Sequence, residues 1–177
     1  MNYINKILTD CILFNNHIHS DNRGNFRVCA NLTELCTETK CNNFTQVNSS
    51  VSNKNVFRGM HFQKAPYEQA KFVYVLEGEV IDFVMDIRVN SENYGKIATI
   101  PLSKSNGNCL YVPRGFAHGF LSLTNNTIFC YLVDNTYSLN HESGFNYKNT
   151  VISEIILKMK IKPIISSKDS LLPEFNI

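Results

Sequence analysis

The sequence has no run of basic residues and little charge overall, since only 18% of its 177 residues are charged. Its 17 lysines and arginines nearly balance 15 aspartates and glutamates. Because phosphate backbones are usually bound by concentrated basic patches, we expect no nucleic-acid partner. Residues 1–14 also lack a long apolar run before Asn15-Asn16-His17. We therefore expect neither a signal peptide nor a membrane-spanning segment.

The six cysteines include no Cys-x-x-Cys pair, and four of them precede residue 42. This clustering does not suit a disulfide framework spread over a fold, so free thiols in a cytoplasmic protein are expected. The His-x-His pattern of many metal sites occurs only at His17-Ile18-His19, with no third ligand nearby. Three convergent ligands are not evident, and no metal is predicted.

The chain does contain many short apolar runs separated by turn signals, which is typical of an all-β protein. Its length suits one domain over residues 1–177. Hairpins are predicted around Glu77-Gly78-Glu79 and around residues 124–127, with further strands at 97–102 and 109–112.

Helices are expected to be few and short. Asn31 can cap one helix, with Glu34 three residues later. Residues 152–161 fit a helix by their spacing and a strand by their β-branched content. Residues 42–54 could form a loop or an edge strand.

A histidine and a lysine lie on adjacent apolar segments that read as strands, in Arg58-Gly59-Met60-His61-Phe62-Gln63 and at Lys71. Burying either side chain costs free energy unless it is paired or used. An imidazole that accepts protons beside an ammonium that stabilises negative charge suits proton abstraction next to a carbonyl. Taken alone, His61 could be an inert, hydrogen-bonded residue and Lys71 an edge lysine. Gly59 allows a bulge that would bring Arg58 and His61 to one side.

Three other residues could carry chemistry. His118 follows a Pro-x-Gly turn at the start of a strand, where site residues often lie, although a histidine on an aromatic face is usually a core residue. Tyr131 could be a core tyrosine with its hydroxyl at the rim. Asp169 could be an exposed turn carboxylate.

Residues 107–118 resemble the second motif of cupin barrels, which has a glycine, a Pro-x-Gly and a histidine. Metal-binding cupins also carry His-x-His and a later glutamate in their first motif, where this chain has only His61. The resemblance thus supports a cupin-like shape and not a metal. On the strand 80–87, Asp82 and Asp86 read as polar-face residues, and Asp86 could pair with Arg88.

From about Asp21 to Asp169, many motifs occur in one unbroken order that resembles the nucleotide-sugar 3,5-epimerases typified by the dTDP-4-dehydrorhamnose 3,5-epimerases. Several motifs in one order are far more specific than any single motif. The motifs are Asp21-Asn22-Arg23-Gly24-Asn25-Phe26, residues 46–52, 56–63 and 69–71, Gly78-Glu79-Val80, Asp86-Ile87-Arg88, Tyr94-Gly95-Lys96, residues 112–121, Tyr131, Tyr137, His141-Glu142-Ser143-Gly144 and Ser167-Lys168-Asp169.

The resemblance implies a cupin-type β-barrel or jelly roll with a few short helices, a homodimer with exchanged N-terminal strands, and no metal or other cofactor. It implies that His61 is the base, oriented and made more basic by Asp169. Lys71 would stabilise an enolate oxygen, Tyr131 would be the acid on the opposite face of the sugar, and His118 would line the sugar pocket.

The substrate implied by the resemblance is a nucleotide-diphospho-sugar, and some of its contacts would reach across the dimer. Two arginines would hold the diphosphate, two aromatic residues would sandwich the base, and polar residues would add contacts. These implied substrate-binding residues are Arg23 and Arg58, Phe26 and Tyr137, and Gln46, Asn48, Glu142 and Lys168.

The implied reaction fits these residues. In a 4-keto-6-deoxy sugar the C3 and C5 hydrogens are both α to the carbonyl, so removing either gives an enolate, and reprotonation from the other face inverts the centre. A neutral histidine near pH 7 can be the base, since its ordinary pKa is ~6.5. The expected reaction converts dTDP-4-dehydro-6-deoxyglucose to dTDP-4-dehydrorhamnose, in deoxysugar biosynthesis for surface polysaccharides.

Other functions stay open. One is a C3-only or C5-only epimerase on a CDP- or GDP-linked sugar; more remote ones are a metal-dependent cupin and a non-catalytic sugar-binding cupin. The chain departs from the family pattern at Val28, where many members are acidic, and at Phe145-Asn146-Tyr147. It has no tryptophan, and residues 158–163 replace the usual Asp-Trp-Pro.

Overall fold

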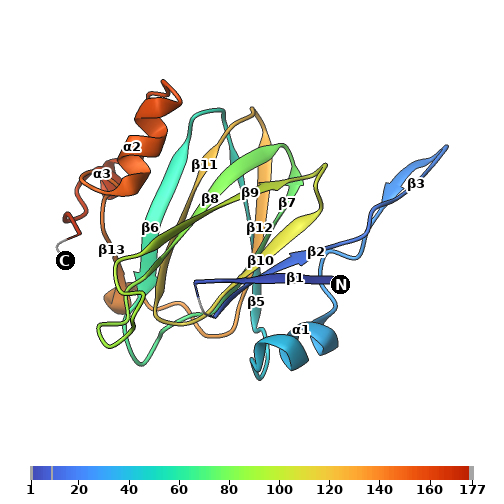
Figure 1. Cartoon of the computed structure of the whole chain (residues 1–177), viewed down its shortest axis with the longest axis horizontal. Helices are drawn as coiled ribbons and strands as arrows, with labels where there is room; N and C mark the ends of the chain where they lie inside the picture. The colour runs from blue at the N-terminus through green and yellow to red at the C-terminus, as the bar shows by residue number, and fades with distance from the viewer. Residues whose placement is uncertain (1, 9, 176–177) are drawn as a thin grey trace.

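The computed structural model describes residues 2–8 and 10–175, which form mainly β-strands with three short α-helices (Figure 1). The helices are α1 (Leu32–Thr39), α2 (Val151–Lys158) and α3 (Ser167–Ser170), and a 3₁₀ turn spans Leu139–His141. The strands are β1 (Asn2–Ile7), β2 (Cys11–Asn15), β3 (His19–Asp21), β4 (Gly24–Phe26), β5 (Gln46–Ser52), β6 (Phe57–Gln63), β7 (Lys71–Glu77), β8 (Glu79–Asp86), β9 (Ile97–Ser103), β10 (Asn108–Val112), β11 (Phe116–Ser122), β12 (Thr127–Val133) and β13 (Glu142–Gly144).

The strands form two larger antiparallel sheets that face each other. The six-stranded sheet has the order β1-β2-β10-β7-β12-β5, and the five-stranded sheet has the order β13-β6-β11-β8-β9. From β5 to β8 the chain passes from one sheet to the other at every turn. This is the all-β, cupin-like sandwich that the sequence predicted.

Both predicted hairpins are wrong, although the chain does reverse at both places. β7 pairs with β10 and β12, whereas β8 pairs with β9 and β11. β11 and β12 likewise belong to different sheets. A turn signal shows where the chain reverses and does not show which strand becomes the neighbour, because these strands bury both of their faces.

Apolar side chains fill three layers. The layer between the sheets includes Val73, Val84 and Phe129. The outer face of the six-stranded sheet packs against Leu35 of α1. The outer face of the five-stranded sheet packs against Ile152 of α2. Because apolar side chains fill most of the space between the sheets, a polar group there, such as Asp82, can be fully buried.

The structure resolves the ambiguous segments. The Asn31 side chain accepts a hydrogen bond from the Glu34 N–H at 3.4 Å, as predicted for the cap of α1. Residues 151–158 are helical because Ile152 and Ile156, one turn apart, are both buried. Residues 46–52 form β5, an edge strand.

The β3–β4 hairpin projects away from the sheets, and all of its residues are exposed (Figure 1). The predicted exchange of N-terminal strands involves a second chain and stays a prediction. All six cysteines are free thiols, as expected. Within the described residues, no helix is long and apolar enough to cross a membrane.

Candidate active site

A cavity of about 440 Å³ opens between the two sheets. Its walls come from β6 and β11 of one sheet, β5, β7 and β12 of the other, and the segment that leads into α3. The residues that line it are Ser50, Val56, Phe57, Arg58, His61, Lys71, His118, Gly119, Phe120, Phe129, Tyr131, Ile164, Ile165, Ser166 and Asp169.

The five residues predicted to be catalytic all line this cavity, on two facing walls. His61 and His118 are cross-strand partners on β6 and β11 of the five-stranded sheet. On the six-stranded sheet, Lys71 pairs with Val133, two residues after Tyr131 on β12. Lys71 and Tyr131 are therefore diagonal neighbours on one face. The histidines thus lie opposite the lysine and the tyrosine.

His61 is bonded to the fifth of these residues, Asp169. Its Nε2 lies 2.8 Å from Asp169 Oδ1. The Asp169 carboxylate also accepts a hydrogen bond from the Gly59 N–H at 3.4 Å, and its own N–H donates to Ser166 Oγ at 3.0 Å. Burial opposes ionisation of Asp169, but these hydrogen bonds, the one with His61 foremost, hold its pKa below the ordinary value. The carboxylate is therefore charged and fixed next to the imidazole.

Gly59 explains how Arg58 and His61 both reach the cavity. Its φ is +136°, and a Cβ there would lie 2.6 Å from the Gly119 Cα, so only glycine fits. The pairing of β6 with β11 shifts register at this point. As predicted, the irregularity turns both side chains to the same side. Arg58 then donates from Nε to Ser52 Oγ at 3.1 Å and from Nη2 to the Val51 carbonyl at 3.2 Å.

Asp82 was predicted to lie on a polar face, and this prediction is wrong. It is fully buried between the sheets, and its two carboxylate oxygens lie 3.0 and 2.8 Å from His118 Nε2. Burial raises its pKa, although His118 and the nearby Lys71 partly oppose this. Alternation along β8 placed Asp82 correctly on the face opposite Phe83, but that face points between the sheets, toward His118, and not to water. The expected Asp86–Arg88 ion pair is present at 2.6 Å.

Lys71 is partly buried at the start of β7. Burial lowers its pKa to about 8, an effect that Asp82 and Glu142 partly offset. Just before it, the Ala70 N–H donates to Asp134 Oδ1 at 2.7 Å.

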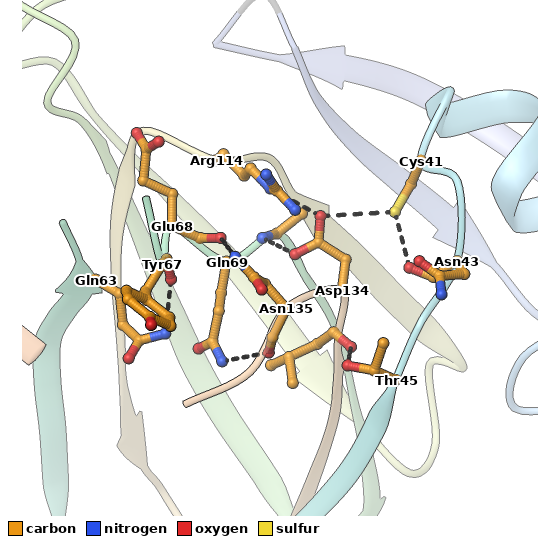
Figure 2. Close-up of polar contacts among 12 residues, drawn as sticks. Cys41, Asn43, Thr45, Gln63, Tyr67, Glu68, Gln69, Arg114, Asp134 and Asn135 are labelled. Atoms are coloured by element: carbon orange, nitrogen blue, oxygen red, sulfur yellow. Dashed lines mark hydrogen bonds and ion pairs between the residues drawn. The ribbon is translucent and has the colours of Figure 1, made fainter. Parts of the chain in front are cut away.

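Asp134 connects the start of β7 to other segments, as Figure 2 shows. Its Oδ2 accepts from Arg114 Nε at 2.9 Å and lies 3.8 Å from Cys41 Sγ. Nearby, Asn135 donates to two carbonyls of the loop that leads to β7. These bonds fix the strand end from which Lys71 enters the cavity.

Tyr131 is partly buried on the wall opposite the histidines. Burial raises the pKa of its phenol, while the positive charge of Arg58 lowers it. The phenol therefore stays protonated near neutral pH and can donate a proton. Its cross-strand partner on the edge strand β5 is Asn48.

Most of the predicted substrate-binding residues do not line the cavity. Glu142 Oε2 accepts from Tyr137 Oη at 2.7 Å and from Lys168 Nζ at 2.6 Å. Burial opposes its ionisation, but these two bonds hold the pKa of Glu142 below its ordinary value. On β5, Gln46 Nε2 donates to Asn48 Oδ1 at 2.6 Å.

Arg23 and Phe26 lie on the projecting β3–β4 hairpin, outside the cavity lining. Arg23 pairs with Asp21 at 2.6 Å, and Phe26 is 67% exposed. The fold of one chain therefore does not bring them to the other site residues. Among residues 2–8 and 10–175, no group of three or more His, Cys, Asp or Glu could hold a metal ion.

Comparisons with known proteins identify the same family over nearly the whole chain. A sequence model of the family described as dTDP-4-dehydrorhamnose 3,5-epimerase matches residues 5–176. A relative of that name from Shigella flexneri is 36% identical over 172 residues, which are 96% of this chain and 93% of the relative.

Solved structures give the same result. The dTDP-4-dehydrorhamnose 3,5-epimerase of Bacillus anthracis str. Ames, with TDP and PPi bound, has a TM-score of 0.89 and 35% identity, over 98% of this chain and 99% of that chain. The dTDP-6-deoxy-D-glucose-3,5-epimerase of Legionella pneumophila Philadelphia 1, in complex with dTDP-4-keto-L-rhamnose, has a TM-score of 0.86 and 29% identity, over 99% of each chain.

Proposed function

We propose that this chain, which belongs to the dTDP-4-dehydrorhamnose 3,5-epimerase family, inverts both C3 and C5 of dTDP-4-dehydro-6-deoxyglucose to give dTDP-4-dehydrorhamnose. Epimerisation is an isomerase reaction, and members of this family are named for it. The observation that carries the proposal is the placement of a histidine–aspartate pair on one wall of the cavity and a protonated tyrosine on the facing wall.

His61 is the proposed base. Its Nε2 faces the charged Asp169 at 2.8 Å, which favours the tautomer with the proton on that nitrogen. Nδ1 then keeps its lone pair and can remove the hydrogen from a carbon next to the carbonyl. Asp169 also stabilises the imidazolium that forms, since its carboxylate stays charged beside the ring.

Tyr131 is the proposed acid. A carbon that loses a proton to one face and regains one from the same face keeps its configuration, so inversion needs a donor on the other face. A sugar ring held between the sheets would have His61 on one side and Tyr131 on the other. A base and an acid so placed each typically contribute ~10²–10⁴-fold.

Lys71 is the proposed partner of the enolate oxygen. Its ammonium is desolvated, so its interaction with a developing negative charge is stronger than in water. The C4 oxygen would lie against it, next to His118, which is held by Asp82. C3 and C5 then flank the same carbonyl, and one set of groups can act on both after a shift of the ring.

The remaining residues would bind the nucleotide diphosphate. Arg58, at one edge of the cavity, offers the guanidinium fork that suits phosphate oxygens. Glu142, Lys168 and Tyr137 would contact the substrate at the rim. Arg23 and Phe26 would reach the cavity of a second chain, in a homodimer with exchanged N-terminal strands.

The test is incubation with dTDP-4-dehydro-6-deoxyglucose in D₂O, followed by NMR and mass spectrometry. Deuterium at C3 and C5, together with the L-rhamno configuration, is the expected result. The His61→Ala variant should bind dTDP normally and exchange neither hydrogen.

Deuterium at one centre only would instead identify a single-centre epimerase. Turnover of a CDP- or GDP-linked sugar, without turnover of the dTDP-linked one, would overturn the substrate assignment. Full activity of His61→Ala would refute the mechanism.

A further inference from the structure

A serine in the cavity wall has a buried hydroxyl without a hydrogen-bond partner. Ser50 lies on β5 and lines the cavity, and within the described residues its Oγ is both shielded from solvent and unpartnered. The only other buried side-chain atoms of this kind in that part of the chain belong to Asn16 and Asn55, which do not line the cavity. Because buried hydroxyls nearly always have a partner, an unpaired one in a binding cavity points to a ligand.

The side-chain oxygens of the residues beside Ser50 on β5 each accept a hydrogen bond within the protein. Strand alternation places Asn48, Ser50 and Ser52 on one face, and the cross-strand partners of the first two, Tyr131 and Phe129, both line the cavity. Asn48 Oδ1 accepts a hydrogen bond from Gln46 Nε2 at 2.6 Å. Ser52 Oγ accepts one from Arg58 Nε. Ser50 is therefore the member of this row whose side-chain oxygen has no hydrogen-bond partner among the described residues.

Arg58 brings a positive charge to the same place. It bonds β5 through Nε, to Ser52 Oγ, and through Nη2, to the Val51 carbonyl, which are the two residues after Ser50. The third guanidinium nitrogen, Nη1, has no hydrogen bond to the described residues. A hydroxyl and a guanidinium N–H group that line the same cavity can together bind a phosphate oxygen.

We propose that the Ser50 hydroxyl donates a hydrogen bond to an oxygen of the substrate's diphosphate, alongside Arg58. The identity of the substrate rests on the proposed function. Rotation about one bond, χ1, carries the hydroxyl between staggered positions. Because it has no protein partner to lose, it turns toward the phosphate without breaking a hydrogen bond.

The experiment compares Ser50→Ala with Ser49→Ala, a matched control on the exposed, opposite face of the same strand. Calorimetric titration with dTDP and with dTMP measures binding, and steady-state turnover of dTDP-4-dehydro-6-deoxyglucose gives KM and kcat. For Ser50→Ala we expect the Kd for dTDP and the KM to rise about tenfold or more, as for loss of a hydrogen bond to a charged group. We expect kcat to stay within about twofold, and dTMP binding to change less than dTDP binding.

Thermal unfolding of the free protein separates a ligand contact from a structural one. Removing an unpartnered buried hydroxyl should leave the Tm of Ser50→Ala equal to the wild-type value or higher. Ser50→Cys keeps the size of the side chain and replaces the hydroxyl with a weak donor, so it should bind dTDP as poorly as the alanine variant does.

Two results would overturn the assignment: unchanged dTDP affinity in Ser50→Ala, or a lowered Tm of the free variant. Unchanged dTDP affinity together with a raised KM would place the contact on the sugar instead. Failure of the proposed function would give a different result from failure of the Ser50 contact. If neither wild type nor variant epimerises the sugar, but Ser50→Ala loses dTDP affinity, the diphosphate contact stands and the reaction does not.

Discussion

Replacing Lys71 with methionine should make the protein more stable at neutral pH while removing its activity. Lys71 carries an ammonium into the cavity, and burial lowers its pKa to about 8. Methionine has a similar length and no charge to desolvate. The variant would also lose the group proposed to stabilise the enolate, so turnover should fall by ~10²-fold or more.

The size of the stability gain follows from the pKa. The ordinary lysine value is 10.5, and the folded protein lowers it to about 8. At about 1.4 kcal/mol for each pH unit, holding the charged form in the fold costs about 3 kcal/mol at pH 7. Between pH 8 and 10.5 the unfolded chain binds more protons than the folded protein, so this cost declines as pH rises, to about 2 kcal/mol at pH 9.

The assay is urea unfolding of wild type and Lys71→Met at pH 7 and pH 9, at one protein concentration because an oligomer's stability depends on it. The variant should be more stable at both pH values, and its advantage should narrow by about 1 kcal/mol at pH 9. Wild-type kcat/KM should decline above pH 8 as Lys71 loses its proton. An advantage that is absent, or that does not change with pH, would refute a lowered pKa at this position.

Two other changes test the remaining parts of the site. Asp169→Asn should lower kcat by ~10²-fold or more and leave dTDP affinity unchanged, because it removes the charge that stabilises the His61 imidazolium and not a group proposed to bind the nucleotide diphosphate; equal loss of kcat and dTDP affinity would contradict this role. Mixing inactive Arg23→Ala and His61→Ala variants after unfolding together should restore about a quarter of wild-type activity, since half of the dimers would be mixed and one of their two sites would be intact. Activity no greater than the sum of the separate variants would rule out a site shared between chains.

Local features of this fold could be predicted from the sequence because their physical causes are local. Asn31 caps α1, and Gly59 permits the irregularity that aligns Arg58 with His61. The pairing of strands could not be predicted, because the partner of β7 is chosen by packing between distant segments. β12 lies about 50 residues farther along the chain, yet it is one of the two strands that pair with β7.

The residues of the site also fall into those that could be predicted from the sequence and those that could not. The motifs around His61, Lys71, His118 and Tyr131 predicted residues that do share one cavity. Asp82 was misread because alternation gives the face of a strand but not whether that face meets water. Arg23 lies on an exposed hairpin away from the cavity, so its proposed role in binding substrate requires the predicted second chain.

The charged groups between the sheets are better explained by function than by stability. The interior is otherwise a layer of valine, leucine, isoleucine and phenylalanine, in which Asp82 and Lys71 each oppose the fold through desolvation. Replacing buried ion pairs with apolar residues of similar size is often neutral or stabilising. A protein under selection for stability alone would have little reason to keep them. Lys71 lines the cavity with two histidines and a tyrosine, and Asp82 contacts one of those histidines, so the placement of both charges points to a reaction that moves protons and stabilises negative charge. The stability of Lys71→Met tests this explanation directly, because function and stability should change in opposite directions.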